Sequence, residues 1–292
     1  MLNDLGRQLL TGVDALMSDE ILEVISGGFD LHTHTSPDIV ERSQTITETA
    51  ADFARHRLGG FVVKSHVVPT TLLVAGAQRD LPATPLPSIT LNRTVGGLNP
   101  VAVEAAAVMG ARVVWLPTKD SRLQHQHEGQ ASHAHLNVLV GGQPSEALHE
   151  VIATAAAHQM TIATGHLGED EVFAVLAVAR EHGADNVIVT HPCLPHLRIS
   201  DSAIAEMAAR GAWIEHTMNS LATGKVGLDH VLDLIERCGT ASTLLTGDLG
   251  QPEFGSIAGG LVMWAVLLLR AGCSPFRVRE MIVSNSRHTL RL

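Results

Sequence analysis

Histidine and aspartate side chains recur in this sequence where short apolar runs end. The side chains that end such runs and could bind a cation are His32, His34, His166, His191 and Asp248. Side chains alternate along a strand, so His32 and His34 point to one face if their segment is extended. Neutral imidazoles and a carboxylate suit zinc or a similar divalent cation. The pattern predicts a divalent metal site, with zinc as the first candidate and manganese or iron as alternatives.

Strand-like and helix-like segments alternate around these residues. Short β-branched runs are each followed by an alanine-rich amphipathic segment that ends near glycine. The expected strands are Gly28 to His34, Gly60 to His66, Pro87 to Asn92, Ala111 to Thr118, Thr161 to His166, Asn186 to His191, Ala212 to His216 and Ser242 to Asp248. The expected helices include Thr45 to Leu58, Pro100 to Met109, Ser145 to Met160, Glu169 to His182, Asp201 to Arg210 and Leu228 to Cys238.

Eight such alternations predict an α/β protein with a (β/α)₈ TIM-type barrel, whose strand ends meet at one rim. A doubly wound open sheet has the same local pattern, but Gly27-Gly28 lacks the spacing of a dinucleotide-binding fingerprint. We predict a short helical extension over residues 1–26 and a single barrel domain over residues 27–292. The apolar stretch from Phe254 to Leu269 is too short to span a bilayer and is interpreted as a buried outer helix or a subunit contact.

The composition favours a soluble, globular, cytoplasmic protein. Of the 292 residues, 45% are hydrophobic, and 20 basic against 30 acidic side chains give a net charge of −10. This balance, without a basic stripe, argues against nucleic-acid or anionic membrane partners. Three cysteines without a close pair indicate neither a disulfide framework nor a cysteine metal knuckle. The N-terminus lacks the pattern of a signal peptide, and we expect a small-molecule substrate and a homo-oligomer.

The metal-ligand pattern resembles the amidohydrolase superfamily. His32 and His34 match its first-strand His-x-His motif, His166 and His191 match its fifth- and sixth-strand histidines, and Asp248 matches its last-strand aspartate. The segments 165–170, 187–191 and 211–215 resemble the phosphotriesterase-related branch in particular. The resemblance covers residues 28–292 and implies a metal-dependent hydrolase with one or two divalent ions, most often zinc. Asp248 would then serve as the proton shuttle to the leaving group.

The sequence departs from the superfamily at the bridging lysine. Many binuclear members carry a carboxylated lysine on the fourth strand, whereas here only Lys119 lies just beyond that strand. Lys64 on the second strand shares a face with Val62 and His66, and a buried lysine needs a partner. Lys64 is therefore a displaced bridging metal ligand, a cation that orients substrate or Asp30, or a structural contact.

Other polar residues follow the strands at the same predicted rim. Residues expected there to bind substrate are His66, Asn92, Arg93, Glu215 and His216, together with Asp38 and Arg42 of the first loop. His66 is equally placed to ligate the metal. The segment from Lys119 to Gln143 is longer than usual for a strand-to-helix connection. It carries His125, His127, His133 and His135 and is interpreted as a substrate lid, as a solvated insertion, or as a source of further metal ligands.

Together these features predict hydrolysis of an amide, lactone or related ester or cyclic bond in a small molecule. The nearest alternative is a phosphoesterase of the polymerase-and-histidinol-phosphatase type, which the opening stretch from Asp30 to Asp38 resembles. That family expects Thr-Asp-His and Asp-x-His where this chain has Lys64-Ser65-His66 and Asp248-Leu249-Gly250. A non-catalytic barrel, or a lyase or oxygenase using the same site, are further alternatives.

Overall fold

The computed structural model describes residues 4–77, 80–130 and 135–292. Its main sheet has eight strands, hydrogen-bonded in the order β1-β2-β3-β4-β7-β8-β9-β10. These strands are β1 (Phe29–Thr33), β2 (Gly60–Val63), β3 (Thr84–Thr90), β4 (Val113–Trp115), β7 (Thr161–Ala163), β8 (Val187–Val189), β9 (Trp213–Thr217) and β10 (Thr243–Thr246). All eight predicted strands are confirmed, although most end earlier than expected.

The last strand returns to the first. The amide of Asp248 donates to the carbonyl of His32 over 2.8 Å, and the amide of His34 donates to the carbonyl of Leu249 over 2.8 Å. A parallel bridge between Thr33 and Leu249 extends this pairing beyond β10. Strands in chain order, with the last bonded to the first, form the predicted (β/α)₈ TIM-type barrel.

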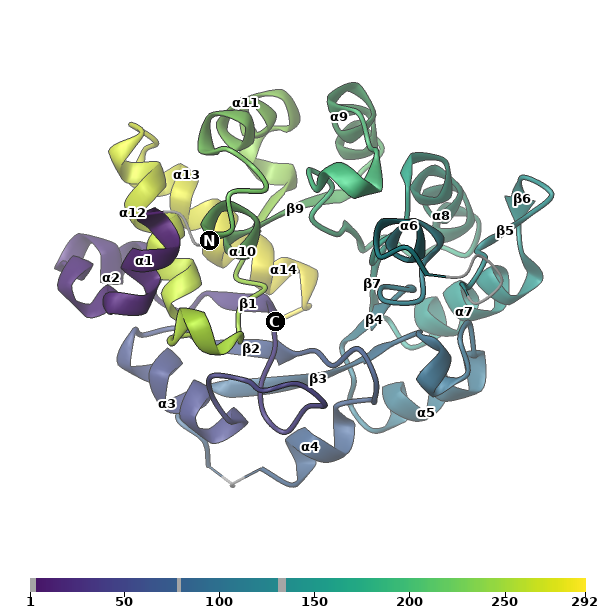
Figure 1. Ribbon diagram of the computed structural model, residues 1–292, viewed down its shortest axis with the longest axis horizontal. Helices are drawn as coiled ribbons and strands as arrows, with labels where there is room; N and C mark the ends of the chain where they lie inside the picture. The colour runs from purple at the N-terminus through teal and green to yellow at the C-terminus, as the bar shows by residue number, and fades with distance from the viewer. Residues whose placement is uncertain (1–3, 78–79, 131–134) are drawn as a thin grey trace. The chain divides into compact units, whose positions relative to one another are not determined.

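Helices separate the strands as the sequence predicts (Figure 1). The confirmed helices are α3 (Ile46–Arg55), α5 (Pro100–Val108), α7 (Glu146–Ala157), α8 (Glu169–Glu181), α9 (Asp201–Ala209) and α11 (Leu228–Cys238). Side chains cap several of them: Thr45 and Glu48 form a capping box at α3, and Ser145 and Ser200 accept backbone N–H groups at α7 and α9.

The contacts within the chain define two units. Unit 1 comprises Met1–Lys64, Leu72–Leu86 and Glu215–Leu292, and unit 2 comprises Ser65–Thr71 and Pro87–Ile214. Strands β3 and β9 each run from one unit into the other. The predicted boundary at residue 26 stays a prediction.

In unit 1, the chain begins with α1 (Asp4–Thr11), the short η1 (Val13–Leu16) and α2 (Asp19–Ile25). Helix α2 packs against α12 (Gly259–Arg270) and α13 (Pro275–Arg279), and the Arg279 guanidinium donates to the carbonyl of Glu23 over 2.8 Å. Trp264 of α12 is fully buried and donates to the carbonyl of Thr246 over 2.9 Å. The apolar stretch is therefore a buried outer helix, and its tryptophan holds the end of β10.

The remaining elements of unit 1 are α4 (Thr71–Ala75), α10 (Met218–Ala222), a π-helical turn at Glu280–Ser284, α14 (Asn285–Thr289) and two short 3₁₀ turns. No helix among the described residues is both long enough and apolar enough to cross a membrane.

In unit 2, a long segment follows β4. It contains α6 (Arg122–His127) and a small antiparallel pair, β5 (Leu139–Val140) and β6 (Gln143–Pro144). A second short helix, η4 (Pro195–Leu197), follows β8 and packs against α6. These two short helices lie beyond the carboxyl ends of their strands, where (β/α)₈ proteins place their functional loops.

Candidate metal centre

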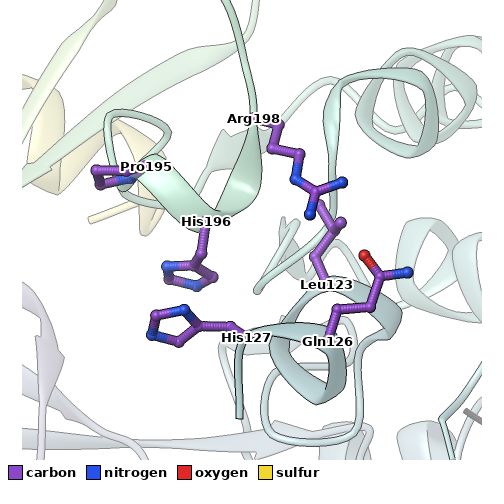
Figure 2. Close-up of a pocket in the computed structure, with 6 residues that line it drawn as sticks. All are labelled: Leu123, Gln126, His127, Pro195, His196 and Arg198. Atoms are coloured by element: carbon purple, nitrogen blue, oxygen red, sulfur yellow. The ribbon is translucent and has the colours of Figure 1, made fainter. Parts of the chain in front are cut away.

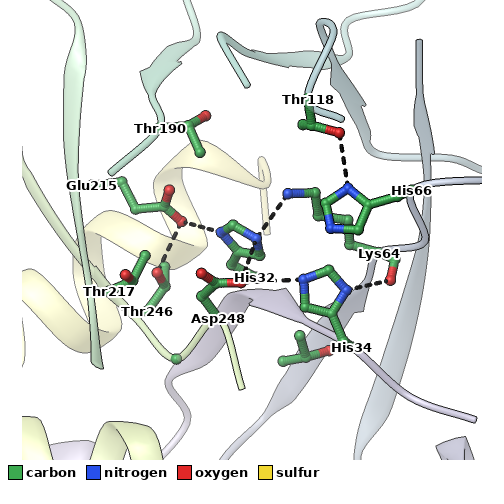
Figure 3. A network of polar contacts seen from close by, with 12 residues as sticks. His32, His34, Lys64, His66, Thr118, Thr190, Glu215, Thr217, Thr246 and Asp248 are labelled. Carbon is green, nitrogen blue, oxygen red and sulfur yellow. Dashed lines mark hydrogen bonds and ion pairs between the residues drawn. The ribbon is translucent and has the colours of Figure 1, made fainter. Parts of the chain in front are cut away.

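Three of the predicted ligands converge in unit 1. The Nε2 atoms of His32 and His34 each lie 3.1 Å from Asp248 Oδ1 (Figure 3). The three ligand atoms all lie within 4.8 Å of one another, and no other such group of three exists among the residues that the structure describes. Both histidines are buried, and the Asp248 side chain is 18% exposed. The arrangement offers two nitrogen ligands and one oxygen ligand to a cation.

The partners of the other ring nitrogens orient these ligands. His32 Nδ1 lies 3.0 Å from a carboxylate oxygen of Glu215, and His34 Nδ1 lies 3.1 Å from the carbonyl of Lys64. Both partners are acceptors, so each Nδ1 donates its proton to them, and the Nε2 of the neutral ring has the lone pair that a metal would use. Such supporting contacts are typical of histidines that bind metals.

The charges of the centre also suit a cation. Burial raises the pKa of Asp248, but the adjacent His32 and His34 outweigh burial and hold it well below the ordinary value. Burial lowers the pKa of His34 to about 4, so this ring is neutral near pH 7. For His32 burial also lowers the pKa, but the neighbouring Asp248 makes the net shift upward. A raised pKa means that His32 holds a proton more readily. A metal would compete with this proton, because both bind the lone pair of Nε2.

Lys64 lies beside this centre, as its predicted inward orientation requires. Its side chain is 1% exposed, and Nζ lies 2.9 Å from His32 Nε2 (Figure 3). Lys64 directly follows β2, whose pairing with β1 brings it next to the His-x-His motif. The contact fits a bridging ligand or a cation that orients other groups, and the choice between them stays a prediction.

Asp30 fixes the two strands that carry the ligands. Its carboxylate accepts the backbone N–H of His32 at 3.0 Å and that of Gly247 at 3.0 Å and 3.1 Å. A side chain at Gly247 would place Cβ 2.6 Å from Asp30 Oδ2, so only glycine permits this approach. Burial raises the pKa of Asp30 to about 7. One carboxylate thus holds the backbone of the ligand His32 and of Gly247, which precedes the ligand Asp248.

A separate histidine cluster lies in unit 2 and contains the other two predicted metal ligands. The ring centroids of His166 and His191 are 5.0 Å apart, and those of His66 and His166 are 6.2 Å apart. His166 Nδ1 lies 2.8 Å from the amide oxygen of Gln124 in α6, which leaves Nε2 with its lone pair. The role of His166 and His191 as ligands stays a prediction.

Two predicted ligands adopt a left-handed backbone conformation. The φ angle is 29° at His191 and 51° at Asp248. Such angles are uncommon for residues other than glycine and cluster at functional sites. In both cases the turn comes directly after a strand and redirects the side chain at the strand end.

The predicted substrate-binding residues occupy different positions. Asn92 is 1% exposed, and its amide group bonds to the His66 carbonyl, to Thr118 and to two backbone N–H groups. Thr118 in turn bonds to His66 Nδ1 over 2.8 Å. Asn92 therefore positions His66, while direct contact of either residue with substrate stays a prediction.

Of the other three predicted substrate-binding residues, one is exposed and two are buried. Arg93 is exposed, and its backbone N–H bonds to Asp120. Glu215 is fully buried and accepts from His32 and from Thr246, at 2.8 Å from the latter. His216 is 2% exposed, points to the opposite face of β9 by alternation, and has a pKa lowered to about 4 by burial. Their substrate roles stay predictions.

Sequence reasoning missed Gln124 and Thr246, which hold His166 and Glu215. Neither residue lies in a recognisable motif, and only the folded chain brings each to its partner. The first-loop candidates Asp38 and Arg42 form a buried ion pair of 2.7 Å with each other. Of the histidines in the segment after β4, His125 is buried beside Asp120, His127 is exposed, and His135 contacts Asn137. His133 lies outside the described residues.

Residues 27–215 match the family described as "Family of unknown function (DUF6282)". The match spans more than half of the 292 residues and includes both the His-x-His strand and the histidines of unit 2. The chain belongs to DUF6282. No curated protein matches this DUF6282 sequence.

Several solved structures are similar to this DUF6282 chain. An amidohydrolase from Pseudomonas aeruginosa matches with a TM-score of 0.68 and 13% identity, covering 94% of this chain and 98% of that one. The probable dipeptidase PvdM from Pseudomonas aeruginosa matches with a TM-score of 0.65 and 11% identity, covering 97% and 98%. An organophosphorus hydrolase mutant from Deinococcus radiodurans matches with a TM-score of 0.58 and 14% identity, covering 90% and 92%. At these identities the likeness shows the fold, and the resemblance to amidohydrolases is confirmed at that level.

Proposed function

We propose that this DUF6282 chain is a metal-dependent hydrolase of the amidohydrolase type that cleaves an amide, lactone or related ester bond in a small molecule. The observation that carries the proposal is the convergence of His32 Nε2, His34 Nε2 and Asp248 Oδ1. Without a metal, a proton shared between His32 and Asp248 and the contact of Lys64 Nζ with His32 Nε2 satisfy part of this group. Coordination of a divalent ion satisfies all three at once.

Zinc suits this donor set best. Imidazole and carboxylate are common zinc ligands, and three protein ligands leave a position for water in a catalytic site. Lys64 Nζ, 2.9 Å from His32 Nε2, is placed to supply a further ligand if it is carboxylated. His166 and His191 of unit 2 are proposed as additional ligands, and the metal content of His191→Asn measures their contribution.

A bound divalent ion would lower the pKa of water toward neutrality and polarise the scissile carbonyl. The protein supplies the remaining functions. Asp248, ionised because its pKa is held low, accepts a proton from the attacking water and passes it to the leaving group. Glu215 keeps His32 oriented and, being anionic, strengthens it as a ligand.

The amide preference rests on the neighbours of similar fold. Two of them are named an amidohydrolase and a probable dipeptidase, whereas a third is named an organophosphorus hydrolase. We therefore propose amides and lactones as the substrates. Phosphoesters are the alternative substrate class that the experiment must exclude.

The proposal is tested by screening zinc-loaded and chelator-treated protein against amides, lactones, carboxylic esters and phosphoesters. We expect hydrolysis of at least one carbonyl class, its loss on chelation, and its return when zinc is added back. Hydrolysis of phosphoesters alone would overturn the substrate class. Absence of metal-dependent turnover across all four classes would overturn the proposed function.

A further inference from the structure

A pocket of about 340 Å³ lies in unit 2, next to the histidine cluster. Its walls come from α6 and from η4 with the residue after it, both of which follow strand ends (Figure 2). The residues that line it are Leu123, Gln126, His127, Pro195, His196 and Arg198. None of these residues is acidic, although the chain as a whole has 30 acidic and 20 basic side chains. The pocket thus differs in charge from the rest of the protein.

Its polar side chains are hydrogen-bond donors arranged around one space. The rings of His127 and His196 stack face to face, with centroids 4.7 Å apart and an interplanar angle of 22° (Figure 2). Arg198 follows η4 with a φ angle of 55° and forms no ion pair with any residue that the structure describes. Imidazole N–H and guanidinium groups both donate to carboxylate and phosphate oxygens, and guanidinium does so with two parallel bonds.

The pocket adjoins the predicted metal ligand His166. The ring centroids of His166 and His196 are 6.0 Å apart in an edge-to-face arrangement. His166 is also held by Gln124 of α6, the helix that carries His127. A molecule whose reacting bond lay at His166 could therefore extend another group into the pocket.

A second metal site explains the pocket less well. Among the described residues, the only three potential ligands that lie close enough to hold one metal ion are His32, His34 and Asp248. The ring nitrogens of the histidines at the pocket therefore do not form a second preformed metal site. Arginine remains protonated in proteins and is not a metal ligand. An anionic group matches His127, His196 and Arg198, and the Gln126 amide N–H can also donate to it.

We infer that the pocket formed by His127, His196 and Arg198 binds an anionic carboxylate or phosphate group of the substrate. The inference rests on the proposed hydrolase and narrows its substrates to small molecules that carry such a group away from the scissile bond. Arg198 and the two histidines are specificity-determining residues in this account, and they take no part in the bond cleavage.

The test is a titration of the protein with inorganic phosphate and with acetate, followed by NMR of the histidine Cε1 protons. We expect the His127 and His196 resonances, assigned by substitution, to shift in a saturable way. Arg198→Gln should weaken this binding by about tenfold or more, because a charge-assisted bidentate contact is lost. Arg112→Gln is the matched control. Arg112 is exposed and lies at the amino end of β4, whereas α6 of the pocket follows the carboxyl end of that strand.

The outcomes separate this inference from the proposed function. Tighter binding of phosphate supports a phosphate group, and tighter binding of acetate supports a carboxylate. Resonances that do not move, or an Arg198→Gln variant that binds as the wild type does, overturn the anion pocket whatever the hydrolase screen shows. If the protein binds anions through Arg198 but hydrolyses no substrate, the proposed hydrolase function is refuted and the anion-binding pocket is supported. With an anionic substrate in hand, Arg198→Gln should raise KM and leave kcat nearly unchanged.

Discussion

Replacement of Asp248 by asparagine is expected to reduce kcat for the best substrate by about 10²- to 10⁴-fold, the usual contribution of a general acid–base group. The asparagine amide has nearly the same shape but cannot accept the proton from water. It also removes the anionic oxygen that lies 3.1 Å from both His32 and His34. The measurement is steady-state kinetics with zinc at saturating concentration, so that weaker metal binding does not hide the loss of the proton shuttle.

Asp233→Asn is the matched control for this variant. Asp233 lies on α11 in the same unit, and its side chain is 50% exposed and paired with Arg237. The same chemical change there should leave kcat within about twofold, since surface substitutions rarely alter a distant site. An Asp248→Asn enzyme that kept full kcat at saturating zinc would refute the role of Asp248 as proton shuttle.

Replacement of Glu215 by glutamine is expected to weaken zinc binding by about 10- to 100-fold, as the loss of a supporting partner of a metal ligand commonly does. Glutamine keeps an oxygen that can accept from His32 Nδ1 but removes the negative charge that makes His32 a stronger ligand. The buried position of Glu215 and its bond to Thr246 hold the carboxylate in this one orientation. Zinc affinity is measured by competition with a chromophoric chelator, with thermal unfolding as the check on the fold.

Glu236→Gln makes the same change at an exposed residue of unit 1, whose carboxylate pairs with Arg277. This control should bind zinc as the wild type does. Equal zinc affinity in Glu215→Gln and the wild type would show that Glu215 does not support the metal centre. It would then favour the earlier prediction that Glu215 contacts substrate.

The strands could be predicted because their sequence signals are local. Each strand is a short β-branched run, and each lies between segments with helical periodicity. The first-strand ligands were predictable for the same reason, since alternation along β1 and the residue after it places His32 and His34 on one face. The same alternation, continued one residue beyond β2, predicts that Lys64 lies beside the first-strand histidines, as it does.

The partners of the ligands could not be predicted, because they depend on distant parts of the chain. His32 and Glu215 are 183 residues apart, and His166 and Gln124 are 42 residues apart. No periodicity relates such positions. Helix α6, by contrast, carried a local signal, because Ser121 caps it by accepting the N–H of Gln124. A serine at this position is a local signal for the start of a helix.

The metal content of the purified protein tests the central claim most directly. After growth with added zinc, elemental analysis of the wild type should give about one or two equivalents of divalent metal per chain, as expected for a catalytic site of this ligand type. His34→Asn should retain the fold by circular dichroism and lose most of that metal. A wild-type protein that binds no divalent metal, or a His34→Asn variant that keeps all of it, would contradict the proposed centre at His32, His34 and Asp248.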